Sequence, residues 1–102
     1  MADRIARHPD LEPAHPGELL REIVLPATGR TKVEIARLLG ISRQTLHDVL
    51  ACRQPVTPAL AVRLGKLFGD GAGVWLRMQA EHDLWRARRE IDVSSIPTIS
   101  AA

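Results

Sequence analysis

The pattern of hydrophobic and polar positions along the chain predicts five short helices. In each segment the apolar side chains recur three and four positions apart, which gathers them on one face of a helix. Glycine, proline and helix-capping residues separate these segments and mark where each helix ends. The predicted helices cover approximately residues 18–25, 31–39, 42–52, 57–68 and 74–89. We therefore predict an all-α fold.

The most informative stretch is the pair formed by the second and third predicted helices, TKVEIARLLGISRQTLHDVLACR, at residues 31–53. Thr31 and Glu34 have the spacing of a capping box at a helix start. Gly40 follows the last apolar residue, where a helix end often needs a left-handed backbone. Ser42 then provides the N-cap of the next helix. Because two helices joined by so short a turn must cross steeply, this spacing predicts a helix-turn-helix.

Polar side chains on the second helix of this pair indicate contact with DNA. Arg43 and Gln44 occupy its first turn, which in this motif enters the major groove. Arginine can make two hydrogen bonds to guanine, and glutamine can make two to adenine. Lys32 and the free N–H groups of the helix starts are placed for phosphates. Polar first turns also occur on helical hairpins that only face solvent, and that alternative stays open. The predicted DNA-binding residues are Lys32, Ser42, Arg43, Gln44, Thr45, His47 and Arg53.

Positive charge is concentrated around the same stretch. The 102 residues carry a formal net charge of +2. Residues 31–68 hold six Lys or Arg and two Asp or Glu, for a net charge of +4. Residues 1–30 and 69–102 each hold four Arg and five Asp or Glu, for a net charge of −1. Clustered positive charge is what phosphate neutralisation requires. The surplus is modest, so we expect weak binding by a monomer and a homodimer as the binding form.

Proline shapes our expectations for the N-terminal part of the chain. Residues 1–15 contain two His-Pro pairs, and proline breaks helices, so we predict an extended arm with His8 and His15 exposed to solvent. Pro26 is expected to stop the first helix. The predicted division of the chain is 1–15 for the N-terminal arm, 16–90 for the DNA-binding domain and 91–102 for the C-terminal tail.

The last predicted helix carries both tryptophans. We expect Trp75 to close the core. Trp85 is the better candidate for a partner interface, because tryptophan is enriched at binding hot spots. The short tail that follows is β-branched in part and interrupted by Pro97. It is expected either to be disordered or to add an edge strand to a partner chain.

The composition and the absence of known motifs argue against several classes of protein. Hydrophobic residues make up 45% of the chain, which supports a folded domain. We expect no membrane span and no secretion signal, because no apolar run is long enough. A single cysteine, Cys52, cannot form an internal disulfide, so we expect a cytoplasmic protein. No phosphate-binding loop, metal-ligand spacing or catalytic constellation is present. We therefore predict a protein that is not an enzyme and uses no cofactor or metal.

Four blocks of sequence between His15 and Arg86 resemble the HigA family of antitoxins, within the wider Xre/Cro-like helix-turn-helix group. The blocks are HPGELLREIVLP, VEIARLLGISRQTL, TPALAVRLGKLFG and VWLRMQAEHDLWRA. The last block is the most specific, because its Trp-Leu pair is followed by Gln-Ala and then by Asp-Leu-Trp. The helix-turn-helix block alone would not separate this family from phage-type repressors.

The resemblance implies a five-helix, lambda-repressor-like domain that dimerises, binds a palindromic operator and represses its own promoter. It also implies a partner, a HigB-like toxin that resembles the RelE-type mRNA endonucleases and that the antitoxin neutralises by binding. Many relatives end the recognition helix with an Asn-Gly turn, whereas this chain has Ala51-Cys52. A phosphate contact by Arg53 depends on that turn. By the same resemblance Lys32 begins the helix-turn-helix, and the base readers are Arg43, Gln44, Thr45 and His47.

Two other functions stay open on the sequence. The first is a stand-alone transcriptional repressor without a toxin, which a toxin-like reading frame directly upstream would argue against. The second is a protein-interaction module that has lost DNA binding, which the positive charge of residues 31–68 argues against. The toxin-binding surface is either the N-terminal arm or the last helix, and the last helix with the tail is the preferred dimer contact.

Overall fold

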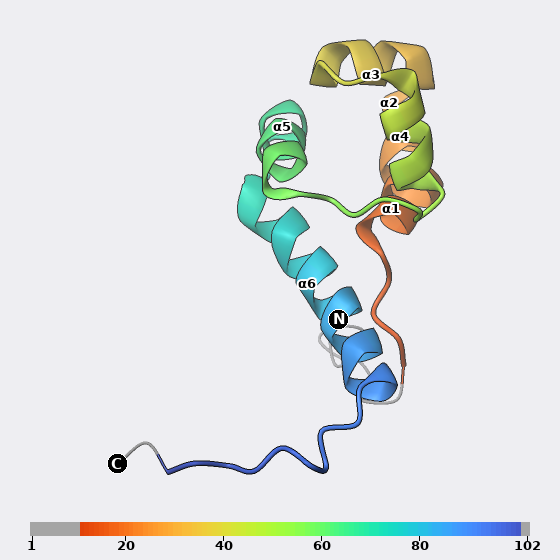
Figure 1. Cartoon of the computed structure of the whole chain (residues 1–102). Coiled ribbons are helices and arrows are strands. Elements are labelled where there is room, and N and C mark those ends of the chain that lie inside the picture. Colours follow the sequence, from red (N-terminus) through yellow and green to blue (C-terminus); the bar gives the residue numbers. More distant parts are fainter. Residues whose placement is uncertain (1–10, 101–102) are drawn as a thin grey trace, which may run out of the picture.

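The computed structural model describes residues 11–100, and all regular structure in this part of the chain is helical. The first helix is continuous and consists of α1 (Pro16–Leu19), a π-helical segment η2 (Leu20–Val24) and α2 (Leu25–Thr28). The prediction of an all-α fold with five helices is confirmed for the described residues. The remaining helices, seen in Figure 1, are α3 (Lys32–Leu39), α4 (Arg43–Leu50), α5 (Pro58–Phe68) and α6 (Ala72–Glu90).

The prediction that Pro26 stops the first helix is wrong. The helix continues through this proline to Thr28 and ends at Gly29, which has a left-handed backbone. A proline inside an α-helix clashes with the carbonyl four residues earlier and lacks the N–H that would bond to it. Just before Pro26, however, the Leu25 N–H donates to the Leu20 carbonyl, five residues back. This π-type bonding widens the turn, so the helix accepts the proline ring without breaking.

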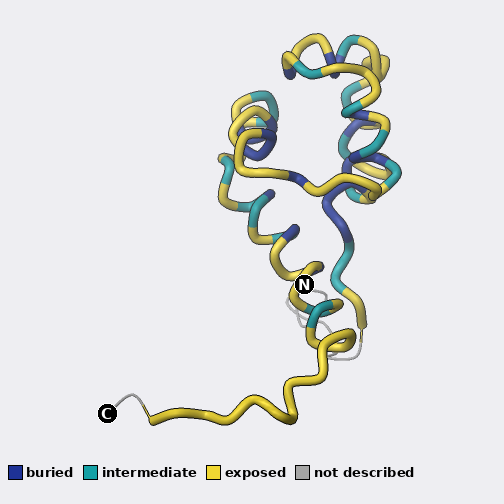
Figure 2. The backbone as a smooth tube through the Cα atoms, viewed as in Figure 1, coloured by how far each residue is buried: buried dark blue, intermediate teal, exposed yellow. Residues whose placement is uncertain are grey.

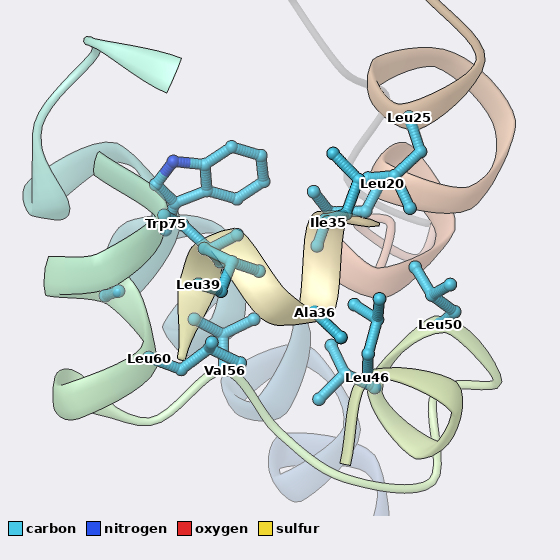
Figure 3. Packing of buried hydrophobic residues seen from close by; sticks show 13 residues of the cluster. Leu20, Leu25, Ile35, Ala36, Leu39, Leu46, Leu50, Val56, Leu60 and Trp75 are labelled. Atoms are coloured by element: carbon cyan, nitrogen blue, oxygen red, sulfur yellow. The ribbon is translucent and has the colours of Figure 1, made fainter. Parts of the chain in front are cut away.

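A single hydrophobic core lies between the inner faces of the helices (Figures 2 and 3). Trp75 is only 2% exposed, which confirms the expectation that it closes the core. It lies near the start of α6, which begins at Ala72 rather than at Val74 as predicted. The buried apolar side chains are Leu20, Leu25, Ile35, Ala36, Leu39, Leu46, Val49, Leu50, Val56, Leu60, Ala61, Leu64 and Trp75.

A buried glutamine joins the loop after α4 to helix α6. The Gln79 side chain is on α6, and its Oε1 accepts the Val56 N–H at 2.7 Å. Its Nε2 donates to Asp83 Oδ1 at 3.0 Å. A buried backbone N–H without a partner would be costly, so this contact stabilises the path of the chain between α4 and α5.

The end of the N-terminal arm runs alongside α6 (Figure 1) and is extended, as predicted, over residues 11–15. The expectation that His15 is exposed is wrong, because its exposed fraction is 6%. Its Nδ1 accepts the Gly17 N–H at 2.9 Å and so caps α1. Proline at the first helical position forces the preceding residue into an extended backbone, which is the geometry of an N-cap. The expectation for His8 lies outside the described residues.

His82 on α6 holds the arm next to the capping histidine. Its Nδ1 lies 2.7 Å from the Pro13 carbonyl, which can only accept, so this nitrogen donates. The His15 and His82 rings meet edge to face with centroids 5.1 Å apart. Glu12 adds an ion pair with Arg86 at 3.4 Å. The arm is therefore attached to α6 by polar contacts that the sequence did not indicate.

The stability of the protein is expected to fall as the pH drops below about 6.5, because burial, and secondarily His82, lower the pKa of His15 from its ordinary value of 6.5. The folded protein then binds a proton at His15 more weakly than the unfolded chain does. The contribution of His15 is therefore complete above 6.5 and is lost as the pH falls towards the folded-state pKa. Protonation would also remove the Nδ1 acceptor that caps α1.

The matched variant for this effect is His15→Asn, which keeps an N-cap acceptor but does not titrate in this range. Urea unfolding followed by circular dichroism between about pH 5 and pH 7.5 should show a shallower dependence on pH for the variant than for the wild type. Equal slopes for the two proteins would show that His15 is not the titrating group.

The tail leaves the end of α6 and runs away from the helices as an exposed segment that contains one turn, in which the Ile96 N–H donates to the Val93 carbonyl (Figures 1 and 2). Among its described residues, 91–100, the structure contains no strand. No helix within residues 11–100 combines the length and the apolar character needed to cross a lipid bilayer. The large apolar side chains that the tail exposes are Ile91, Val93, Ile96 and Ile99.

Candidate nucleic-acid interface

The turn between α3 and α4 is built from the local signals that predicted it. Thr31 Oγ1 accepts the Glu34 N–H at 3.1 Å, and Glu34 Oε1 accepts the Thr31 N–H at 3.3 Å, so the capping box is present. Gly40 ends α3 with φ of 72°. From α5, Arg63 Nη1 donates to the Leu39 carbonyl at 2.7 Å, which satisfies a free carbonyl at this helix end. The steep crossing of α3 and α4 is visible in Figure 1.

Ser42 caps α4, as predicted. Its Oγ accepts the Thr45 N–H at 3.0 Å and donates to Thr45 Oγ1 at 2.8 Å. The two hydroxyl side chains proposed to contact DNA are thus bonded to each other. Thr45 is half-buried, whereas Ser42 is exposed. In the free protein their main contribution is to define where the helix starts and how its first turn is held.

The first turn of α4 presents its polar side chains outward. Arg43, Gln44 and His47 are exposed and, together with Ser42, line one shallow hollow on the surface. Lys32 is exposed at the start of α3. The structure therefore brings together Ser42, the N-cap of α4, with Arg43, Gln44 and His47 of its first turns, and the N–H groups of the helix start lie beside them. Such a surface can donate hydrogen bonds to base edges and to phosphate oxygens.

The opposite face of α4 is fixed to the core. Leu46, Val49 and Leu50 are at most 3% exposed. From the first helix, Arg21 Nη1 donates to the Leu50 carbonyl at 2.8 Å and so caps the end of α4. Gly17 approaches so closely that a Cβ on it would lie 1.9 Å from the Val49 carbonyl oxygen. The helix therefore has one orientation, which aims its first turn away from the body of the protein.

Asp48 is a member of this surface that the sequence analysis missed. Its Oδ1 accepts Gln44 Nε2–H at 3.0 Å and Arg53 Nη2–H at 2.9 Å. The hydrogen bond from Arg53 is the main cause that lowers the pKa of Asp48. Arg53 is predicted to contact a phosphate, and in this structure its guanidinium is paired with Asp48. The i,i+4 spacing of Gln44 and Asp48 was the available signal.

The turn after α4 explains how Arg53 reaches Asp48. Cys52 has φ of 61°, the one positive φ among the described residues other than glycine. This left-handed residue turns the chain back, so the N–H groups of Arg53 and Gln54 both donate to the Asp48 carbonyl, at 2.8 and 3.2 Å. Cys52 therefore takes the left-handed backbone that glycine would adopt with less strain.

Replacing Cys52 by glycine is expected to raise the free energy of unfolding by about 0.5–1 kcal/mol. A left-handed backbone costs a residue with a Cβ about 1–2 kcal/mol, and glycine avoids this cost but loses more entropy on folding. Urea unfolding measures the difference, with Cys52→Ala as the control that keeps the Cβ. A Cys52→Gly protein less stable than the alanine variant would contradict the strain assigned to this position.

Among residues 11–100, no group of three His, Cys, Asp or Glu side chains is arranged to hold a metal ion. The sequence analysis assigned no role in this surface to four polar residues that position it, namely Arg21, Asp48, Arg63 and Gln79. Each of these side chains makes hydrogen bonds, either to a segment distant in the sequence or along one helix face, and most of the partners are backbone groups.

The chain is similar to a curated bacterial protein and to solved antitoxin and antidote structures. Virulence-associated protein I of Dichelobacter nodosus is 34% identical over 76 residues, which cover 74% of this chain and 70% of that protein. A solved antidote protein of a plasmid maintenance system from Nostoc punctiforme has a TM-score of 0.73 and 35% identity, covering 78% of this chain and 86% of its own. The Pseudomonas aeruginosa antitoxin HigA, solved with the higBA promoter, has a TM-score of 0.74 and 28% identity, covering 85% of this chain and 99% of its own. No family model matches the chain.

The five helices and the capped, outward first turn of α4 define an Xre/Cro-like helix-turn-helix protein with a lambda-repressor-like fold. The chain belongs to the HigA family of antitoxins within that group. The resemblance seen in the four sequence blocks is therefore confirmed.

Proposed function

We propose that this chain is an antitoxin that binds its own operator as a homodimer and represses its own operon. In the same proposal it binds and neutralises a HigB-like toxin of the RelE-like mRNA endonuclease type in the cytoplasm. The observation that carries the DNA-binding part is the first turn of α4, where Arg43, Gln44 and His47 are exposed on a helix whose other face is buried.

The distribution of charge supports the same proposal. Residues 31–68, which include α3, α4 and α5, hold the net charge of +4. Neutralising phosphates releases counterions, and this supplies much of the affinity of a DNA-binding protein. One copy offers few such contacts. A homodimer that places two α4 helices in successive major grooves would double them, on a palindrome with half-sites roughly 34 Å apart.

The test of operator binding uses the full chain and a fluorescent duplex from the region upstream of its own reading frame. We expect a specific complex whose stoichiometry is two chains per palindrome, and whose affinity falls steeply as the salt concentration rises. Analytical ultracentrifugation of the same mixtures measures the stoichiometry. Equal affinity for this duplex and for an unrelated duplex would reject the repressor function.

Replacing Lys32 by alanine is expected to weaken binding to operator and unrelated DNA by the same factor. Lysine acts as a point charge on the phosphate backbone, so its loss should reduce the slope of log affinity against log salt by about 1 and leave base preference unchanged. Anisotropy titrations at several salt concentrations give this slope. Arg88→Ala is the charge-matched control, because Arg88 lies near the far end of α6 (Figure 1) and should not change the slope.

The toxin partner is tested by co-expression of the chain with the adjacent reading frame and purification through a tag on one of them. A stable pair in which the partner no longer arrests growth supports an antitoxin. Growth arrest that persists, or absence of a complex, would leave the stand-alone repressor as the function. Variants of Trp85, which is half-buried on α6, test whether this helix takes part in the contact.

A further inference from the structure

Asp48 lies one turn beyond Gln44 on α4 and binds two of the predicted DNA-contacting side chains at once. One carboxylate oxygen, Oδ1, accepts from Gln44 Nε2 at 3.0 Å and from Arg53 Nη2 at 2.9 Å. The side chain of Asp48 is 18% exposed, whereas that of Arg53 is 58% exposed. Asp48 is thus mostly buried, although the two residues it binds are exposed, and it lies next to the surface proposed to face DNA.

A carboxylate can orient the amide of a glutamine. An ionised aspartate only accepts hydrogen bonds, whereas the glutamine amide has one accepting and one donating end. When Nε2 points towards Asp48, it donates a hydrogen bond to the carboxylate. With Oε1 turned there instead, two acceptors would meet and repel each other. Asp48 therefore favours one of the two amide orientations of Gln44, and the observed contact is that orientation.

The orientation decides which base edge Gln44 can match. Nε2 has two N–H groups, and Asp48 takes one of them, so Oε1 and the second N–H remain for a base. This acceptor and donor pair matches N6–H and N7 of adenine. Guanine presents two acceptors at the same edge, O6 and N7, and is matched by a glutamine that can turn both of its N–H groups to the base. Bonding to Asp48 withdraws one of them.

Arg53 reduces the repulsion that the Asp48 carboxylate would otherwise exert on nearby phosphates. An unpaired aspartate beside DNA would repel the backbone, and the Arg53 guanidinium offsets that charge at 2.9 Å. The turn at Cys52 and the bonds from the Arg53 and Gln54 N–H groups to the Asp48 carbonyl hold this pair together. In this arrangement Arg53 pairs with Asp48, and the carboxylate offsets part of the positive charge that Arg53 would otherwise present to a phosphate.

We propose that Asp48 is a positioning residue that gives Gln44 its preference for adenine over guanine in the operator. This inference rests on the proposed function, because it assigns the base specificity of the same surface. Asp48 does not touch the base in this account and acts through the amide of Gln44, while Arg53 compensates its charge.

The experiment uses the full-length protein and a set of operator duplexes that carry each of the four bases at one position. That position is the one where Gln44→Ala relaxes the base preference. We expect wild type to prefer adenine to guanine there by about tenfold or more. Asp48→Asn should reduce the ratio to within about threefold, because an asparagine amide can pair with either orientation of Gln44. Asp48→Ala, which removes the partner, should do the same.

A second readout separates positioning from a structural effect. In a Gln44→Ala background, Asp48→Asn should leave the base ratio at that position unchanged. In both Asp48 variants the salt dependence should steepen by about 1 unit of slope, because Arg53 is released to the phosphates. Circular dichroism confirms that the variants fold.

Three results would overturn the inference. The first is an Asp48→Asn protein with the wild-type ratio, and the second is a change of ratio that is the same size in the Gln44→Ala background. Both would leave the operator-binding function standing. The third is a wild-type protein that shows no sequence preference at any position, which would overturn the proposed function together with this inference.

Discussion

Replacing Trp75 by alanine is expected to lower the free energy of unfolding by about 3–5 kcal/mol, the range for removing a buried aromatic side chain. The indole is 2% exposed and packs against Phe68 of α5 with ring centroids 6.2 Å apart. Its Nε1 also donates to Asp70 Oδ1 at 3.0 Å. Because a small domain has only about 5–15 kcal/mol of stability, this one change should remove a large part of it.

Urea unfolding followed by circular dichroism measures the effect, and the melting temperature should fall by at least about 12 °C for a domain of this size. Trp75→Phe keeps a ring in the core and should be milder. Trp85→Ala is the matched control on the same helix, because Trp85 is only half-buried and stacks on Arg89, whose guanidinium carbon lies 3.6 Å from the ring centroid. Equal losses for Trp75→Ala and Trp85→Ala would show that the core does not depend on Trp75.

The helix-turn-helix could be predicted from the sequence because each of its signals acts within a few residues. The Thr31–Glu34 box, the left-handed Gly40 and the Ser42 cap each depend on neighbours no more than four positions away. The apolar residues of α4 also recur within a few positions. Their spacing fixes the buried face of the helix, and therefore the side of the first turn that faces outward. Local chemistry of this kind is visible in a single sequence.

The first helix and the arm could not be predicted in the same way. Pro26 looked like a helix end because the sequence does not reveal the π-helical turn that accommodates it. His15 looked exposed because the residues that bury it come from distant parts of the chain, among them His82. Gln79 belongs to the Gln-Ala pair of the most specific sequence block, but its role could not be predicted, since its partner Val56 lies 23 positions earlier. These contacts exist only once the tertiary fold has formed.

The sequence predicted which positions of the candidate site face outward. It did not predict the hydrogen bonds between the side chains of the site. Spacing showed that Arg43, Gln44 and His47 leave the apolar stripe, which the structure confirms by their exposure. It did not show that Asp48 ties Gln44 to Arg53, because that link needs the turn at Cys52. Their roles in binding DNA stay predictions, and the most direct test removes the two base readers of the first turn together.

Replacing Arg43 and Gln44 together by alanine is expected to remove most of the preference of the protein for its operator. Each bidentate contact to a base discriminates by about 1–3 kcal/mol, so losing both should cost about 2–6 kcal/mol of specific binding, or roughly 30-fold to 10⁴-fold in affinity. Binding to unrelated DNA should fall much less, because Lys32 and the helix N–H groups that contact phosphates remain. Both side chains are exposed and the Ser42 cap is untouched, so the fold should persist.

Competition titrations of the operator duplex against an unrelated duplex at one fixed salt concentration measure this loss directly. Arg88→Ala, on the far part of α6, controls for the removal of one positive charge and should leave the ratio of the two affinities at the wild-type value. If the double variant also keeps the wild-type ratio, bases are not read by the first turn of α4. The exposed first turn of Arg43, Gln44 and His47 would then be a solvent-facing helix start, or part of a contact with a protein partner, and the DNA-reading function proposed for it would be wrong.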